Sequence, residues 1–215
     1  MSVQNIIDKA QQIEIDRRRV VGQTISRSQR IKTAERSTAQ PWRFKITPPG
    51  SLPWTASRGF IQVIDSNDRV GEYTISLNNN PGLNYITAYM GELTQNQLNS
   101  LDIHAVNTNS LVITTLPSVS SSTVVFAQGD LIQPENSRYP YVVAQTVVRG
   151  LSTTTSVTLH RPIITSEGVS LVGQGLAVGN SCTWRVVVAG LPSYQLIPMR
   201  QVQYTGDFEL IEKVI

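Results

Sequence analysis

The sequence is poor in the residues that build disulfide bonds and charged surfaces. It has a single cysteine, Cys182, so an internal disulfide is excluded, which suits a reducing compartment or a fold that needs no covalent cross-link. Charged residues make up only 15% of the chain, against about a quarter in typical domains. Serine, threonine, asparagine and glutamine fill the difference. A surface of this kind is typical of a protein that neighbouring molecules cover.

Long apolar runs and catalytic motifs are also missing. No apolar run approaches the ~20 residues of a membrane-spanning helix, and the N-terminus lacks the apolar core of a signal peptide. The two histidines, His104 and His160, belong to no HExxH motif or Cys/His cluster, so we expect no metal and no cofactor. Cys182 shares the face of a predicted strand with Trp184, which indicates a small buried side chain rather than a nucleophile. We therefore expect that the protein is not an enzyme.

Two further patterns have both a functional and a structural interpretation. Gly173, Gly175 and Gly179 resemble a dinucleotide-binding loop, but the spacing differs and a strand pattern follows. We interpret them as a tight turn or a close approach of two backbones. Asp207 and Glu209 lie on one face of a predicted strand and could bind a cation or act as acid and base. An ordinary exposed face is the favoured interpretation.

Basic residues, in contrast, are concentrated at one end of the chain. Residues 1–45 hold ten of the eighteen basic residues and four acidic ones, so this segment carries a charge of +6. The other 170 residues hold eight basic and eleven acidic groups, a charge of −3. Fourteen of the basic residues are arginine, which suits fixed and partly desolvated pairings. The split predicts a basic arm that attaches to another molecule.

The pattern of apolar residues divides the chain into an arm and a body. Between residues 3 and 16, apolar side chains recur at helical spacing and predict a helix. Residues 22–40 show no period and predict an extended arm that is disordered in free solution. We therefore expect an N-terminal helix and arm over 1–40 and a body over 41–215. The serine-rich stretch 118–123 is a possible internal boundary.

From Pro41 onward the sequence is rich in strand patterns. In residues 42–47, Trp42, Phe44 and Ile46 alternate with polar residues. Similar strand-like runs cover residues 60–65, 72–77, 85–90, 111–116, 123–128, 139–148, 156–161, 169–173, 182–190 and 208–215. One short helix is predicted within 92–101, with Thr94 as its N-cap and Leu98 and Leu101 as its contacts. About ten strands without alternating helices predict an all-β barrel or sandwich.

The basic arm allows three interpretations. Arginine clusters neutralise phosphates, so the arm could bind nucleic acid. Membrane-surface binding needs a broader apolar face than residues 3–16 offer. The third interpretation, which we favour, is pairing with acidic surfaces of another copy or of a partner protein, because the body itself is acidic.

Three stretches resemble structural proteins of tailed-phage tails. They are RRRVVGQTISRSQRIKTAERSTAQPWRFKITP at the arm, GDLIQPENSRYPYVVAQTVVRG with the following VTLHRPII, and the C-terminal LPSYQLIPMRQVQYTGDFELIEKVI. The second is similar to the strand-turn-strand of tail-tube and baseplate-hub barrels. In the third, Gly206-Asp207-Phe208-Glu209 resembles their closing strand. A plain tube subunit has no long basic arm, so the resemblance favours a component that starts or adapts the tube.

The resemblance implies a virion structural protein, assembled in host cytoplasm into a ring of identical copies at the tube–baseplate end of a tail. Its partners would be itself and other tail or baseplate proteins. We expect Trp42 and Phe44 to anchor the arm to its own body. The arm residues expected to contact neighbouring subunits are Arg17, Arg18, Arg19, Arg27, Arg30 and Arg36. A neck or head–tail joining protein, a nucleic-acid-binding β domain and a hydrolase or carbohydrate-binding module remain alternatives.

Overall fold

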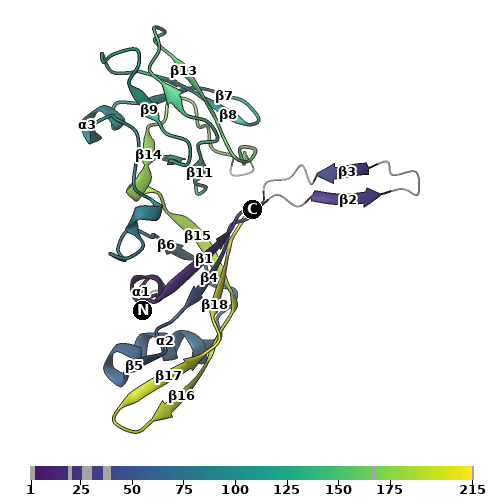
Figure 1. The fold of residues 1–215 in the computed structure, drawn as a ribbon, viewed down its shortest axis with the longest axis vertical. Helices are drawn as coiled ribbons and strands as arrows, with labels where there is room; N and C mark the ends of the chain where they lie inside the picture. The colour runs from purple at the N-terminus through teal and green to yellow at the C-terminus, as the bar shows by residue number, and fades with distance from the viewer. Residues whose placement is uncertain (1–2, 19–20, 26–30, 36–39, 166–167, 215) are drawn as a thin grey trace.

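A computed structural model of the chain describes residues 3–18, 21–25, 31–35, 40–165 and 168–214, with residues 21–25 and 31–35 described by their backbone only. The molecule consists of two lobes and a projecting hairpin (Figure 1). The first lobe is formed by the two ends of the chain, and the second lobe is inserted between them. The expected all-β class is confirmed, because the described residues form many antiparallel strands and only three α-helices.

The first lobe is built around a five-stranded antiparallel sheet in the order β1-β4-β18-β15-β6. A three-stranded sheet, β16-β17-β5, extends from it, and helices α1 and α2 complete the lobe. The elements are α1 (Gln4–Asp8), β1 (Gln12–Asp16), β4 (Arg43–Thr47), β5 (Ser51–Pro53), α2 (Trp54–Ser66), β6 (Tyr73–Ile75), β15 (Trp184–Gly190), β16 (Ser193–Ile197), β17 (Gln201–Thr205) and β18 (Phe208–Glu212).

The second lobe is made of shorter strands and loops. After the 3-10 turn η1 (Asn84–Ile86) it contains α3 (Gln95–Leu98), β7 (Asp102–Val106), β8 (Ser110–Thr114), β9 (Val124–Phe126), β10 (Leu131–Pro134), β11 (Tyr141–Val142), β12 (Val147–Val148), β13 (Thr155–Thr158), β14 (Leu176–Val178) and the turn η2 (Gly179–Ser181). The loop 118–123 lies inside this lobe, between β8 and β9. Here the predicted helix is confirmed, because α3 begins after Thr94 and both Leu98 and Leu101 are buried.

Each lobe has its own apolar core, and one small sheet separates the two. In strands β10 and β11, Leu131 and Val142 belong to the core of the first lobe. The adjacent Ile132 and Tyr141 belong to the core of the second lobe. Successive side chains of a strand point to opposite faces, so these strands supply both cores at once. The two lobes are therefore packed together through shared strands rather than joined by a linker.

Two segments differ from the sequence-based expectations. The helix expected over 3–16 ends at Asp8, because Ile13 and Ile15 alternate with Glu14 and fit a strand that pairs with β4. Residues 60–65, expected as a strand, lie in helix α2, which places Phe60, Val63 and Ile64 on one face against the core. Runs 85–90 and 169–173 form no strand.

The finer architecture also differs from the expectation. None of the sheets formed by the described strands closes into a barrel. The strands are shorter and more numerous than the ten or so expected. Several of them contain only two or three residues, because turns and loops interrupt the apolar runs that the sequence presents as continuous.

Candidate assembly interface

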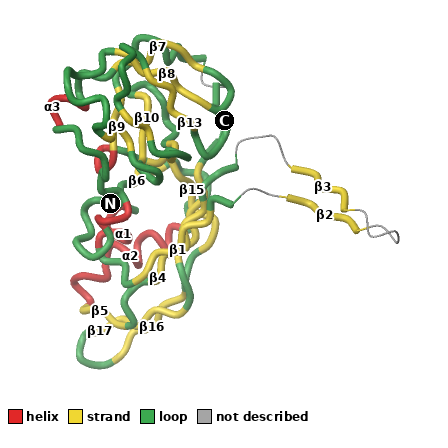
Figure 2. The backbone as a smooth tube through the Cα atoms, turned by 45° about the horizontal axis from the view of Figure 1, so that its top comes forward, coloured by secondary structure: helices red, strands yellow, loops and turns green. Residues whose placement is uncertain are grey.

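The most distinctive feature of the surface is a β-hairpin that stands away from both lobes (Figures 1 and 2). It consists of β2 (Val21–Ile25) and β3 (Ile31–Glu35), paired antiparallel, and lies in the chain between β1 and β4. The expected extended arm is thus folded back on itself over these residues. A two-stranded hairpin is marginally stable alone in water, so a hairpin of this kind is best stabilised by contact with another molecule. Four of the expected contact residues, Arg19, Arg27, Arg30 and Arg36, lie outside the described residues.

The other two arginines lie at the base of the hairpin and are held by the chain itself. The guanidinium of Arg18 donates to both carboxylate oxygens of Asp16, at 3.0 and 3.1 Å. Hydrogen bonds from the Arg18 side chain and backbone lower the pKa of Asp16 to about 2. Arg17 lies over the ring of Trp42, 5.3 Å from its centroid. Both arginines thus contact the body at the point where the hairpin leaves it.

Trp42 and Phe44, the expected anchors, are both buried in the core of the first lobe. Their rings stack with centroids 6.1 Å apart, and Trp184 of β15 contacts both, at 5.4 and 5.6 Å. Such aromatic pairs add to the stabilisation that burial of their area provides. The strand that follows the hairpin is therefore firmly seated.

A buried ion pair next to this cluster was not anticipated from the sequence. Arg161, from the second lobe, donates to both carboxylate oxygens of Glu212 at the end of β18, at 2.5 and 2.7 Å. Arg161 also donates to the carbonyl oxygens of Gln40 and Pro140, and Glu212 accepts the backbone N–H of Trp42. This pair joins both lobes to the segment that leaves the hairpin. We refer to Arg161 and Glu212 as the interlobe latch.

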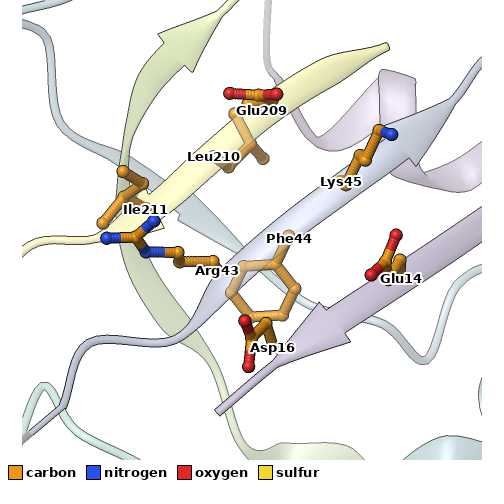
Figure 3. A pocket seen from close by; sticks show the side chains of 8 residues that line it. All are labelled: Glu14, Asp16, Arg43, Phe44, Lys45, Glu209, Leu210 and Ile211. Carbon is orange, nitrogen blue, oxygen red and sulfur yellow. The ribbon is translucent and has the colours of Figure 1, made fainter. Parts of the chain in front are cut away.

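On the outer face of the five-stranded sheet, acidic and basic side chains alternate from one strand to the next. Figure 3 shows Glu14, Lys45 and Glu209 on three neighbouring strands, around a shallow cavity of about 180 Å³. The register places Lys45 opposite Glu14 on one side and Glu209 on the other. Lys45 forms an ion pair with Asp207 at 3.3 Å. Cross-strand pairs of opposite charge stabilise a sheet, and a face with both signs is suited to recognise a complementary protein surface.

Further along the same sheet the charge becomes positive. Glu72 lies within 3.5 Å of three cationic groups, those of Arg138, Arg185 and Lys213. Its pKa is held below the ordinary value, first by the hydrogen bond from Lys213 and then by the attraction of the two arginines. One carboxylate shared by three cations leaves an excess of positive charge at the surface. This cluster is a second place where a charged partner could bind.

The residues considered for chemistry occupy structural positions. His104 is exposed, and Nδ1 of the half-buried His160 accepts the Val142 backbone N–H. Cys182 is buried, and burial raises the pKa of its thiol to about 12. One Asp207 carboxylate oxygen accepts the Thr47 hydroxyl and the other pairs with Lys45.

The described part of the chain contains neither a cluster of metal ligands nor a helix that could cross a membrane. Within residues 3–18, 40–165 and 168–214, no three His, Cys, Asp or Glu side chains lie together as a metal site would require. Among the described helices, none is both long and apolar enough to cross a bilayer.

The three glycines that resembled a nucleotide-binding loop form no single loop: Gly173 lies in a turn, Gly175 in a β-bridge with Asp102 and Gly179 in η2. Gly173 and Gly179 have φ values of 77° and 61°, which favour glycine. A Cβ at Gly179 would lie 2.8 Å from the carbonyl oxygen of Thr87. The turn at Gly173 and the close backbone approach at Gly179 thus both favour glycine.

Comparison with protein-family models and with curated proteins found no match to this chain.

Proposed function

We propose that this protein is a ring-forming structural subunit of a phage tail, located at the tube–baseplate end, where it starts or adapts the tube. It assembles in host cytoplasm, remains in the virion and has no enzymatic role. The observation that carries the proposal is the projecting β2–β3 hairpin within a strongly basic segment. A hairpin that stands away from its own body presents both of its faces to another molecule, such as a second subunit.

Charge supports a protein partner. Residues 17–36 contain seven basic residues and one acidic residue, so the segment carries 7 − 1 = +6. In our proposal the hairpin lies across a neighbouring copy, with Arg19, Arg27, Arg30 and Arg36 close to carboxylates such as Glu14 and Glu209 of that copy. Arg17 and Arg18 fix the exit angle at the base. Ordering the hairpin on binding delays assembly until a ring nucleates.

The proposal also accounts for sheets that remain open within one chain. The five-stranded sheet ends with β1 on one side and β6 on the other, and these strands have one paired neighbour each among the described strands. Edges of this kind favour strand addition between molecules. A ring needs two different complementary faces on each copy, so the barrel expected from the sequence would be completed between copies.

The test is to excise the hairpin while keeping the body intact. Deleting residues 1–36 is unsuitable, because Val3, Ile6 and Ile7 are buried in the first core and Gln12–Asp16 pair with β4. Asp16 and Arg43 are register partners, so a short glycine-containing turn can replace residues 19–39 between two neighbouring strands. We expect the excised protein to remain a folded monomer by circular dichroism and sedimentation velocity, while the full chain forms rings.

A second variant tests the charge of the hairpin without removing the hairpin itself. Arg27→Gln, Arg30→Gln and Arg36→Gln together keep the length of the hairpin and remove three charges. We expect them to weaken ring formation and to reduce its salt dependence. Rings of normal abundance from the excised protein would overturn the proposal. Binding of short DNA with a steep salt slope that is lost on excision would instead favour the nucleic-acid alternative.

A further inference from the structure

Strand β16 forms an open edge of the sheet β16-β17-β5. It pairs with β17 on one side, and no described strand pairs with its other side. The strand has five residues, and none of them is charged. Proteins usually protect such edges with charged residues, proline or very short strands. The opposite edge of the same sheet, β5, has three residues and ends in Pro53, so it is protected in this way, whereas β16 is not.

Apolar side chains on and beside β16 are exposed as well. Leu196 is 63% exposed, and Met199, in the turn between β16 and β17, is 91% exposed. Met199 and Arg200 both have positive φ, at 64° and 58°, which is costly for residues other than glycine. This strained turn holds an apolar side chain in water, and contact with another molecule would bury it.

The projecting hairpin carries a strand edge that matches β16. Strand β2 pairs with β3 and with no other described strand, has five residues and contains no charged one. The hairpin stands away from the β16 of its own chain in both views of the molecule (Figures 1 and 2). The β16 that receives it is therefore that of another copy.

An acidic residue near the start of β16 complements the basic segment that contains β2. Glu209 is the register partner of Gly190, which precedes Ser193 by three positions. A Cβ at Gly190 would lie 3.1 Å from a carboxylate oxygen of Glu209. Glu209 is exposed and forms no ion pair with another described residue. Its charge therefore remains available to attract a basic segment of another copy.

We propose that β2 of one copy adds to β16 of the next copy as an antiparallel strand, so that the hairpin and the sheet β16-β17-β5 form one continuous sheet. The inference rests on the proposed function and names the surface that receives the hairpin. Antiparallel pairing over the full length of both strands places Gln23 opposite Gln195. It also brings the end of β2, which Arg27 and Arg30 follow in the sequence, to the end of β16 that lies near Glu209. Since β2 and β16 are different surfaces, the contact is heterologous and can close a ring.

Cysteine cross-linking between two full-length variants tests this pairing. Gln23→Cys and Gln195→Cys chains are mixed and oxidised with copper phenanthroline. Facing residues of antiparallel strands have Cα atoms roughly 4.5–5.5 Å apart, which is within reach of a disulfide. We expect a dimer joined between positions 23 and 195 in the mixture and none from either variant alone, because Cys182 is buried. Gln128→Cys, at an exposed position of the second lobe, is the matched control and should not cross-link to Gln23→Cys.

A charge placed on the strand edge gives a second measurement. Leu196→Lys should raise the protein concentration at which half of the chains are in rings by about tenfold or more, because a lysine on an edge opposes strand addition. Leu151→Lys adds the same charge at a position of the second lobe that is 94% exposed, and it should leave this concentration unchanged.

Three results would overturn the inference while the proposed function stands. The first is a set of rings that require the hairpin but give no cross-link between positions 23 and 195. The second is equal ring formation by Leu196→Lys and Leu151→Lys. The third is cross-linking of Gln195→Cys to itself, because β16 would then pair with β16 of another copy. If the unaltered chain forms no rings, the proposed function fails, and the cross-link alone decides whether β2 binds β16.

Discussion

Replacing Arg161 by methionine removes one half of the interlobe latch and tests whether the latch holds the two lobes together. The Arg161 side chain is 4% exposed and that of Glu212 is not exposed at all. The substitution deletes four hydrogen bonds, two of them to the Glu212 carboxylate. It also removes the guanidinium that lies over the rings of Tyr139 and Tyr141. The carboxylate is then left buried with the Trp42 N–H as its donor and without its cation.

Removing one partner of a buried ion pair typically costs about 3–5 kcal/mol, and we expect Arg161→Met to reduce the free energy of unfolding by that amount. Because domains are stable by only ~5–15 kcal/mol, this is a large fraction of the total. Urea unfolding, followed by tryptophan fluorescence and circular dichroism, measures the change from the transition midpoint at constant slope. Faster amide exchange at Trp42 would show that the strand after the hairpin is loosened as well.

A double-mutant cycle separates the pair from its surroundings. Glu212→Leu should also be strongly destabilising, because it leaves Arg161 buried without its carboxylate. The double variant Arg161→Met/Glu212→Leu should be destabilised by clearly less than the sum of the two single changes, since no charge is left unpaired. If the two effects add to within about 0.5 kcal/mol, or if Arg161→Met costs less than about 1 kcal/mol, the reasoning is refuted.

Three further predictions concern single residues. Cys182 should resist alkylation in the folded protein at pH 8 and react fully in urea, and rapid labelling of the folded protein would contradict its burial. Because burial raises the pKa of the Cys182 thiol to about 12, the free energy of unfolding should fall as pH rises from 9 toward 12. Thr94→Ala should cost about 1 kcal/mol of unfolding free energy, measured in urea, because Thr94 is the N-cap of α3, whereas the exposed Gln95→Ala should cost less. Gly179→Ala should lower the melting temperature, because a Cβ there would lie 2.8 Å from the Thr87 carbonyl oxygen and φ is 61°. Gly50→Ala, where a Cβ meets no neighbouring atom, is the control, and equal melting temperatures for the two variants would argue against strain at Gly179.

Features that depend on neighbouring residues could be predicted from the sequence. The alternation in 42–47 predicts a strand with Trp42 and Phe44 on its buried face, and β4 confirms it. Thr94 and the two leucines after it predict α3. Where two periods compete, the prediction is less secure. Between residues 3 and 13 the apolar side chains satisfy a helical stripe, yet Ile13 and Ile15 also fit a strand, and pairing with the edge of β4 decides between the two.

The interlobe latch could not be predicted, because it is formed by residues far apart in the chain. Arg161 meets Glu212 from 51 positions away, and no local period links them. One signal was available. Glu212 continues the buried face of Phe208 and Leu210, so an acidic residue was already placed in a core position. A buried carboxylate needs a cation, and this would have been reason to search for one.

The sequence by itself determined the all-β class, the concentration of basic charge in the first 45 residues and the burial of one face of strand β4, because composition and period are local properties. Only the tertiary structure decided that Gln12–Asp16 pair with β4, that a second lobe with its own core is inserted between β6 and β15, and that the basic segment forms a projecting hairpin. It also decided that Arg17 lies over Trp42 and that Trp42 packs against Trp184. These facts depend on which strand edges meet, and contacts between distant segments set that choice.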